Sequence, residues 1–147
     1  MKPSPDTALQ HPLVGQRVDL IDSPALVVDL DAMERNITRM ADFARKHQVQ
    51  WRPHANAHRS AELALQMQRA GAVGACVQKI AEAEVLAAGG VRDITLTNQV
   101  VAYPKLLRVA RLAARLQAQG GRLALAVDSP EGITRLAEAM AQAAPQT

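Results

Sequence analysis

Short apolar runs alternate along the chain with segments whose apolar residues are spaced three or four apart. A continuous apolar run is typical of a buried parallel strand, and the wider spacing predicts a helix with one face in the core. An extended segment lies at residues 50–55, and the strands predicted from aliphatic runs lie at residues 74–78, 93–98 and 122–128. The helical segments lie at residues 61–70, 80–88 and 104–119 and from Pro130 onward. This alternation predicts right-handed βαβ units around a parallel sheet, and therefore an α/β fold.

Two of the predicted helices have a well-defined inner face. The first, at residues 80–88, should turn two glutamates outward and end at a glycine pair, with Ile80, Ala83, Leu86 and Ala87 inward. The second, at residues 104–119, should present Leu107, Ala110, Leu112, Ala114 and Leu116 as its apolar surface.

The N-terminal part has a different pattern. Residues 1–22 contain three prolines and predict an irregular leader. Residues 25–30 predict a strand bounded by Pro24, and a helix capped by Asp31 should follow. The apolar face of that helix is Met33, Ile37, Met40 and Ala44.

Periodicity alone leaves two architectures open. A doubly wound sheet of four or five strands fits within 147 residues, whereas a closed eight-stranded barrel needs roughly 250. Pro145 follows the last predicted helix, where a proline introduces a new segment, so we expect the chain to stop between elements.

Composition excludes several classes of protein. The net charge of +3 is mild and its arginines are scattered, so we expect no nucleic-acid partner. Cys76 is the only cysteine, which excludes an internal disulfide and fits a reducing cytoplasm. We see neither a signal peptide nor an apolar run long enough for a membrane span.

Residues 51–59 have the pattern of an active-site strand. With a period of two, one face is apolar and the other is polar, the polar one being Arg52, His54, Asn56 and His58. Barrel interiors are normally filled by aliphatic side chains, so a polar row at a strand end indicates a site. The alternative is that the strand ends near Ala55 and the remaining polar residues begin a solvated loop.

A metal or phosphate site is not expected here. His54 and His58 have the spacing that binds zinc on a helix, but the segment is extended and no Cys, Asp or Glu lies nearby. The chain contains neither a G-x-G-x-x-G nor a Walker-type run.

Several blocks resemble one enzyme family. Residues 23–36 resemble the opening of the alanine racemase-like (fold type III) pyridoxal-phosphate enzymes. Residues 52–60 resemble the R-P-H-x-K-x-H-K-S signature of the D-threonine aldolase and D-3-hydroxyaspartate aldolase or dehydratase branch. Residues 71–84 and 93–101 match its next two strands, so the resemblance covers residues 23 to about 140.

This resemblance implies the architecture. Residues 23–147 would be the N-terminal half of an incomplete (β/α)8 TIM-type barrel, without its C-terminal half and the β domain. Residues 25–30 would pair within that missing β domain. The family also implies pyridoxal 5'-phosphate, a homodimer at full length, and a divalent metal whose ligands lie outside this chain.

The family's Schiff-base lysine falls at Asn56, whose carboxamide is neither a nucleophile nor a base. By the same resemblance Asn56, His54, Gln78 and Asn98 are candidate cofactor-binding residues, since Asn56 can still hydrogen-bond to the cofactor. His54 is also a candidate catalytic residue. We do not interpret Lys79 as a replacement, because the family has a lysine there as well.

The function implied is that of a pyridoxal-phosphate-dependent lyase acting on D-3-hydroxy amino acids, by retro-aldol cleavage or dehydration. This chain would be a fragment, inactive as it stands because of Asn56. The alternatives are an amino-acid racemase-type relative, a non-catalytic pyridoxal-phosphate-binding module, and a half-barrel with no role of its own.

Overall fold

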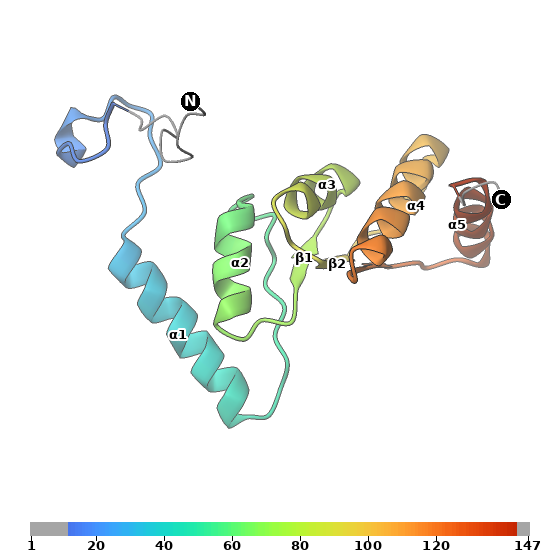
Figure 1. Cartoon of the computed structure of the whole chain (residues 1–147), viewed down its shortest axis with the longest axis horizontal. Coiled ribbons are helices and arrows are strands. Elements are labelled where there is room, and N and C mark those ends of the chain that lie inside the picture. The colour runs from blue at the N-terminus through green and yellow to red at the C-terminus, as the bar shows by residue number, and fades with distance from the viewer. Residues whose placement is uncertain (1–11, 144–147) are drawn as a thin grey trace, which may run out of the picture. The chain divides into compact units, whose positions relative to one another are not determined.

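A computed structural model describes residues 12–143, and the chain divides into two compact units, residues 1–33 and 34–147. The prolines at positions 3 and 5, and Pro145 with the segment it would introduce, lie outside the described residues. The elements in chain order (Figure 1) are η1 (Val18–Leu20), α1 (Leu30–Lys46), α2 (Ala61–Arg69), β1 (Ala75–Val77), α3 (Ile80–Ala88), β2 (Asp93–Leu96), α4 (Tyr103–Ala118), β3 (Arg122–Leu125) and α5 (Pro130–Ala143).

No strand forms at residues 25–30 within the described chain, although the apolar pattern predicts one, and the pairing with a missing β domain that the resemblance implies stays a prediction. Residues 25–29 are extended but belong to no sheet, and Leu26 is 95% exposed. A strand needs a neighbour to take up its backbone hydrogen bonds, and none lies alongside this segment within the described residues. Helix α1 begins at Leu30, one residue early, and its cap is Asp29 rather than Asp31, because Asp29 Oδ1 accepts the Ala32 amide at 2.9 Å.

The second unit contains a parallel sheet in the order β1-β2-β3. Residues 51–54 lie against the free edge of β1 through a single bridge between His54 and Cys76. The Ala55 amide donates to the Cys76 carbonyl and the Cys76 amide to the Pro53 carbonyl, both at 2.8 Å. Each strand therefore lies beside its predecessor in the sequence.

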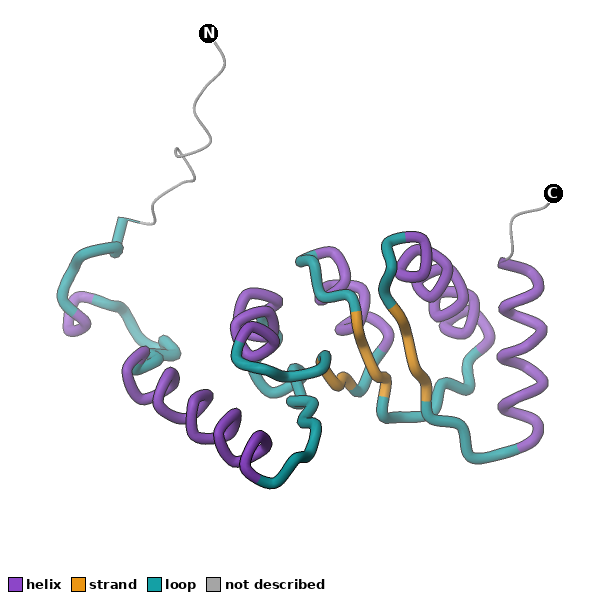
Figure 2. The backbone as a smooth tube through the Cα atoms, turned by 60° about the horizontal axis from the view of Figure 1, so that its bottom comes forward, coloured by secondary structure: helices purple, strands orange, loops and turns teal. Residues whose placement is uncertain are grey.

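The helices follow one another along the sheet in the same sequence (Figure 2). Contacts join α2 to α3, α3 to α4 and α4 to α5. Right-handed crossovers between parallel strands that are added in one direction place every connecting helix on the same face. The helices therefore form one layer, and the opposite face of the sheet is left without a helix within the described residues.

Alternate strand residues divide between these two faces. The core contains Ala75 and Val77 of β1, Ile94 and Leu96 of β2, and side chains of α3 and α4. Leu123 and Leu125 of β3 pack against it. The register aligns Cys76, Thr95 and Ala124, which share the other face.

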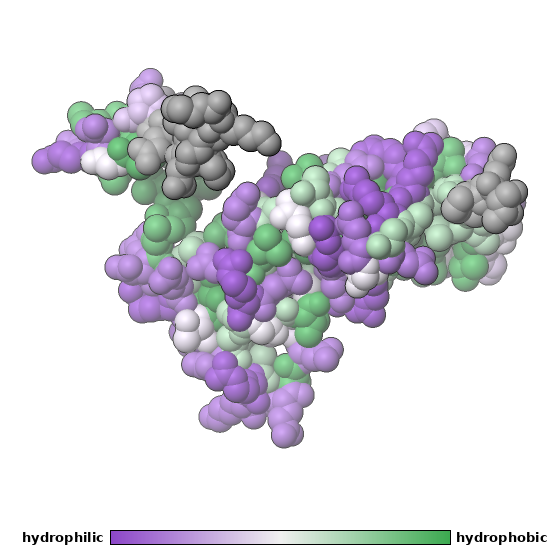
Figure 3. All heavy atoms as spheres, in the orientation of Figure 1, coloured by the Kyte–Doolittle hydropathy of each residue, from purple (hydrophilic) through white to green (hydrophobic). Residues whose placement is uncertain are grey.

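Helix α3 has the predicted bounds and inner face, with Ile80, Ala83, Leu86 and Ala87 all buried. In α4 the prediction is partly wrong. Ala114 is exposed, and Leu106 and Val109 are buried in addition to the predicted Ala110, Leu112 and Leu116. Helix α4 contacts β3 and α5 as well as α3, so its buried residues depend on several neighbours. Its outer surface carries arginines and is hydrophilic in Figure 3.

Asp93 ties the amino-terminal end of the sheet together. Its Oδ1 lies 2.7 Å from Arg52 Nη1 and its Oδ2 lies 3.1 Å from Arg122 Nη2. Arg52 crosses over Gly74 to reach it, and a Cβ at Gly74 would lie 2.0 Å from Arg52 Nη1. The carboxylate thereby links residues 51–54 and β3 to β2.

We expect Asp93→Asn to destabilise the chain in a pH-dependent way. Partial burial raises the pKa of Asp93, but hydrogen bonds and attraction from Arg52 and Arg122 outweigh burial and hold this pKa below its usual value. A carboxyl group whose pKa is lower in the folded chain stabilises the fold fully at any pH above its unfolded pKa. That stabilisation is lost as the pH falls through the pKa of the folded state. Urea unfolding should give a loss of about 1–2 kcal/mol at pH 7, shrinking below pH of about 4.

Asp42→Asn is the matched control, because Asp42 forms an exposed pair with Arg45. Its loss should stay below about 0.5 kcal/mol at every pH. Equal losses for the two variants would contradict a special role for Asp93.

Candidate functional site

The carboxyl-terminal edge of the sheet brings together several of the predicted site residues. His54, Gln78 and Asn98 follow or end successive parallel segments, and such ends meet at one edge. Gln78 Nε2 donates to Thr97 Oγ1 at 3.2 Å, and Thr97 Oγ1 donates to the Val77 carbonyl at 3.2 Å. Thr97 was not predicted from the sequence, because its pairing with Gln78 depends on the register of β1 and β2.

The predicted polar row at residues 51–59 is correct only as far as His54. Residues 55–58 form a turn, in which the Arg59 amide donates to the Ala55 carbonyl at 2.7 Å. Arg59 closes the turn with φ of 54°, in the left-handed region. The strand therefore ends where the alternative interpretation placed it, and Asn56 and His58 do not continue its polar face.

The turn nevertheless does not simply lead into solvent. Asn56 and His58 are both half-buried. Asn56 Oδ1 and His58 Nε2 are shielded from solvent and have no hydrogen-bond partner within the described part of the chain. Buried polar atoms are nearly always paired, so a buried acceptor and a buried donor without partners in one turn indicate a place for a ligand or water.

His58 also connects the turn to helix α2. Its Nδ1 accepts the Ser60 amide at 3.1 Å, and Ser60 Oγ accepts the Leu63 amide as the N-cap of α2. Burial lowers the pKa of His58, which favours the neutral imidazole. Since Nδ1 accepts a hydrogen bond, the proton of this neutral ring belongs on Nε2.

The remaining candidates have simpler surroundings. Asn98 is exposed, and its Oδ1 accepts the following Gln99 amide at 3.1 Å. Cys76 is buried between strands, and burial raises the pKa of its thiol, as expected for a small core residue. Lys79 is exposed at the start of α3, where Glu82 Oε2 accepts its backbone amide at 3.1 Å.

Two cavities lie near this edge of the sheet. One of about 290 Å³ is lined by Ala55, Val77 and Leu86, with Arg59, Lys79 and Glu82 at its polar side. Ala55 and Val77 belong to the core, so this cavity lies on the helix side of the sheet rather than on the side of His54.

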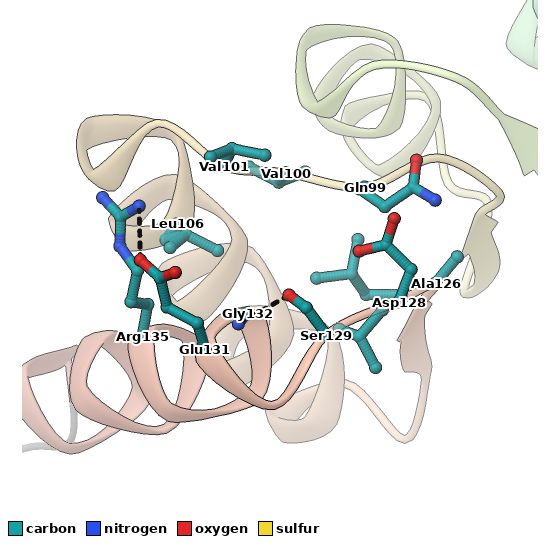
Figure 4. A pocket seen from close by; sticks show the side chains of 12 residues that line it. Gln99, Val100, Val101, Leu106, Ala126, Asp128, Ser129, Glu131, Gly132 and Arg135 are labelled. Atoms are coloured by element: carbon teal, nitrogen blue, oxygen red, sulfur yellow. Dashed lines mark hydrogen bonds and ion pairs between the residues drawn. The ribbon is translucent and has the colours of Figure 1, made fainter.

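The other cavity, of about 90 Å³, lies between the segment after β2 and the start of α5 (Figure 4). The side chains of Gln99 and Asp128 lie at the same end of it. Ser129 caps α5, its Oγ accepting the Gly132 amide at 3.1 Å. Its volume is below that of most cofactor sites, which begin at about 300 Å³.

No group of three or more His, Cys, Asp or Glu side chains suited to a metal occurs within residues 12–143. No helix in the same range is long and apolar enough to cross a membrane.

A family match covers most of the chain. Residues 28–147 match the family described as alanine racemase, N-terminal domain. The chain belongs to this family. The resemblance predicted from residues 23–36 and 52–60 is thereby confirmed.

Two of the proteins that this chain is similar to are aldolases. The 3-hydroxy-D-aspartate aldolase of Paracoccus denitrificans is 39% identical over 128 residues, which cover 86% of this chain and 32% of that protein. The D-threonine aldolase of Arthrobacter sp. is 36% identical over 132 residues, which cover 90% of this chain and 34% of that protein. Among solved structures, the D-threonine aldolase of Filomicrobium marinum superposes with a TM-score of 0.78 at 42% identity. The superposition covers 84% of this chain and 32% of that one. The chain therefore spans about a third of the length of these curated relatives.

We expect His58 to titrate below its unfolded value of about 6.5 and to hold its proton on Nε2 at pH 7. Nitrogen-15 NMR of the imidazole distinguishes the two tautomers and gives the titration midpoint. The same histidine in the urea-unfolded chain provides the reference. A proton on Nδ1, or a midpoint at or above the unfolded one, would contradict the geometry of this turn.

Proposed function

We propose that this chain supplies the N-terminal barrel half of a pyridoxal-phosphate-dependent lyase that acts on D-3-hydroxy amino acids. The observation that carries the proposal is the carboxyl-terminal edge of the sheet. There the signature segment ends in a turn whose Asn56 Oδ1 and His58 Nε2 are buried and unpartnered among the described residues. The D-threonine and hydroxyaspartate aldolases and dehydratase among its relatives support the substrate class.

The order of the sheet supports the proposed half-barrel architecture. A doubly wound sheet reverses its strand order at a switch point and so places helices on both faces. Here residues 51–54, β1, β2 and β3 are added in one direction beneath one layer of helices. That progression, continued through further units, closes into a (β/α)8 barrel.

The residues present fit the cofactor in one respect, because Asn56 Oδ1 and His58 Nε2 are buried polar atoms without a partner among the described residues, and a polar ligand could pair with them. We propose that His54, Gln78 and Asn98 surround it and that Asn56 occupies the place of the family's lysine. When bound, pyridoxal 5'-phosphate supplies an electron sink for the carbanion of its substrate. Gln78 is oriented by Thr97, and His58 holds the turn against α2.

Asn56 favours a second candidate, a non-catalytic module that binds the cofactor without a covalent bond. Its carboxamide is neither a nucleophile nor a base, so the chain lacks at this position the amine that captures the cofactor. The divalent metal, the homodimer and the D-amino acid substrate that the family implies are proposed for the full-length protein only.

We expect Asn56→Lys to restore covalent capture. Incubation with pyridoxal 5'-phosphate and borohydride, followed by peptide mapping, should place a stable adduct on residue 56 of the variant and none there in the unsubstituted chain. Asn56→Gln is the matched control, since glutamine is longer but has no amine. An adduct on Lys79 in the unsubstituted chain would overturn the assignment of position 56.

We expect the isolated chain to self-associate, because within the described residues its sheet has an unpaired edge at β3 and a face without helices. Sedimentation velocity over a concentration series should show dimers or larger species. Ala124→Lys, which places a charge on the bare face of β3, should shift the population toward monomer. Ala114→Lys on the exposed surface of α4 should not. A monodisperse, cooperatively unfolding monomer would instead favour a closed, compact sheet.

A further inference from the structure

We infer that the Asn56 turn binds the amine form of the cofactor, pyridoxamine 5'-phosphate, in preference to the aldehyde form. The inference rests on the proposed function, since it places the cofactor at this edge of the sheet. It concerns which form of the cofactor the site binds when residue 56 is asparagine. The carrying observation is Asn56 Oδ1, a buried acceptor with no partner among the described residues.

The position of Asn56 is fixed by the backbone on both sides of it. The Ala55 amide donates to the Cys76 carbonyl at 2.8 Å, and the Arg59 amide donates to the Ala55 carbonyl at 2.7 Å. Ala55 is itself buried in the core at 1% exposure. These contacts hold the main chain of the turn in place, and Asn56 Oδ1 is shielded from solvent within it without a partner among the described residues.

The two cofactor forms differ in what they offer that acceptor. An amine has N–H donors, whereas an aldehyde has only an oxygen acceptor, and two acceptors placed together leave both unpaired. Failure to pair a buried polar group costs enough to change an affinity by about tenfold or more.

The length of the side chain fits the same conclusion. The oxygen of asparagine lies two bonds closer to Cα than the nitrogen of lysine, a difference of about 2.5 Å for an extended chain. This shortfall is close to the N···O distance of a hydrogen bond, about 2.9 Å. A ligand amine that takes the place of the missing lysine nitrogen is therefore within hydrogen-bonding reach of Oδ1.

Calorimetric titration of the 147-residue chain tests the inference directly. The ligands are pyridoxamine 5'-phosphate, pyridoxal 5'-phosphate and 4-deoxypyridoxine 5'-phosphate, which carries an unreactive methyl group in place of the amine. We expect the amine form to bind about tenfold more tightly than the other two. Fluorescence of Trp51, the single tryptophan, five residues before Asn56, gives an independent readout.

Two substitutions of similar size separate the acceptor from the shape of the side chain. Asn56→Asp keeps an acceptor and should keep the preference for the amine. Asn56→Leu removes the acceptor and should bind the amine and methyl forms equally. Loss of the preference in Asn56→Asp would show that the carboxamide presents its N–H₂ group, and would overturn the inference. Circular dichroism establishes that each variant is folded before it is titrated.

The Asn56→Lys variant distinguishes failure of this inference from failure of the proposed function. If that variant is captured at residue 56 by pyridoxal 5'-phosphate and borohydride, while the unsubstituted chain shows no preference for the amine, only the inference is wrong. If the variant is not captured and none of the three ligands binds the unsubstituted chain, the proposed function fails together with the inference.

Discussion

The carboxylate of Asp93 holds the frame on which the candidate site depends. It lies between Arg52 and Arg122, and so fixes residues 51–54 and β3 relative to β2. Because Gly74 has no side chain, Arg52 can pass over β1 to reach it. A partly buried charge is stable only when paired, so this arrangement favours one register of residues 51–54 over its neighbours.

That register determines where the turn begins. With Arg52 held at Asp93, His54 lies opposite Cys76 and the backbone leaves the sheet at Ala55. The charged end and the candidate site therefore occupy opposite ends of the same short segment. The helix-covered face is aliphatic, and the register aligns the small residues Cys76, Thr95 and Ala124 on the other face.

What the sequence predicted correctly is what local periodicity controls. Helix α3 has its expected bounds because its apolar spacing and its terminal glycines agree. Residues 25–30 form no strand within the described chain. Their apolar pattern indicates a preference for a strand, but a strand forms only beside a partner. The alternation at residues 51–59 failed after His54 for a related reason, since composition does not reveal that the backbone turns at Ala55. The Gln78–Thr97 pair required the register of two strands, which no single segment contains.

Residue 56 lies in the turn whose start this register determines. A lysine there would carry a positive charge at a half-buried turn, and desolvation would disfavour that charge unless a ligand neutralised it. Asparagine has no charge, so the turn can form without a ligand, at the lesser cost of one unpaired carbonyl oxygen. A lysine ammonium group at this position would need an anionic or covalent partner, whereas the asparagine carbonyl oxygen needs a hydrogen-bond donor. The proposed loss of covalent capture and the proposed preference for the amine form of the ligand therefore have the same physical origin.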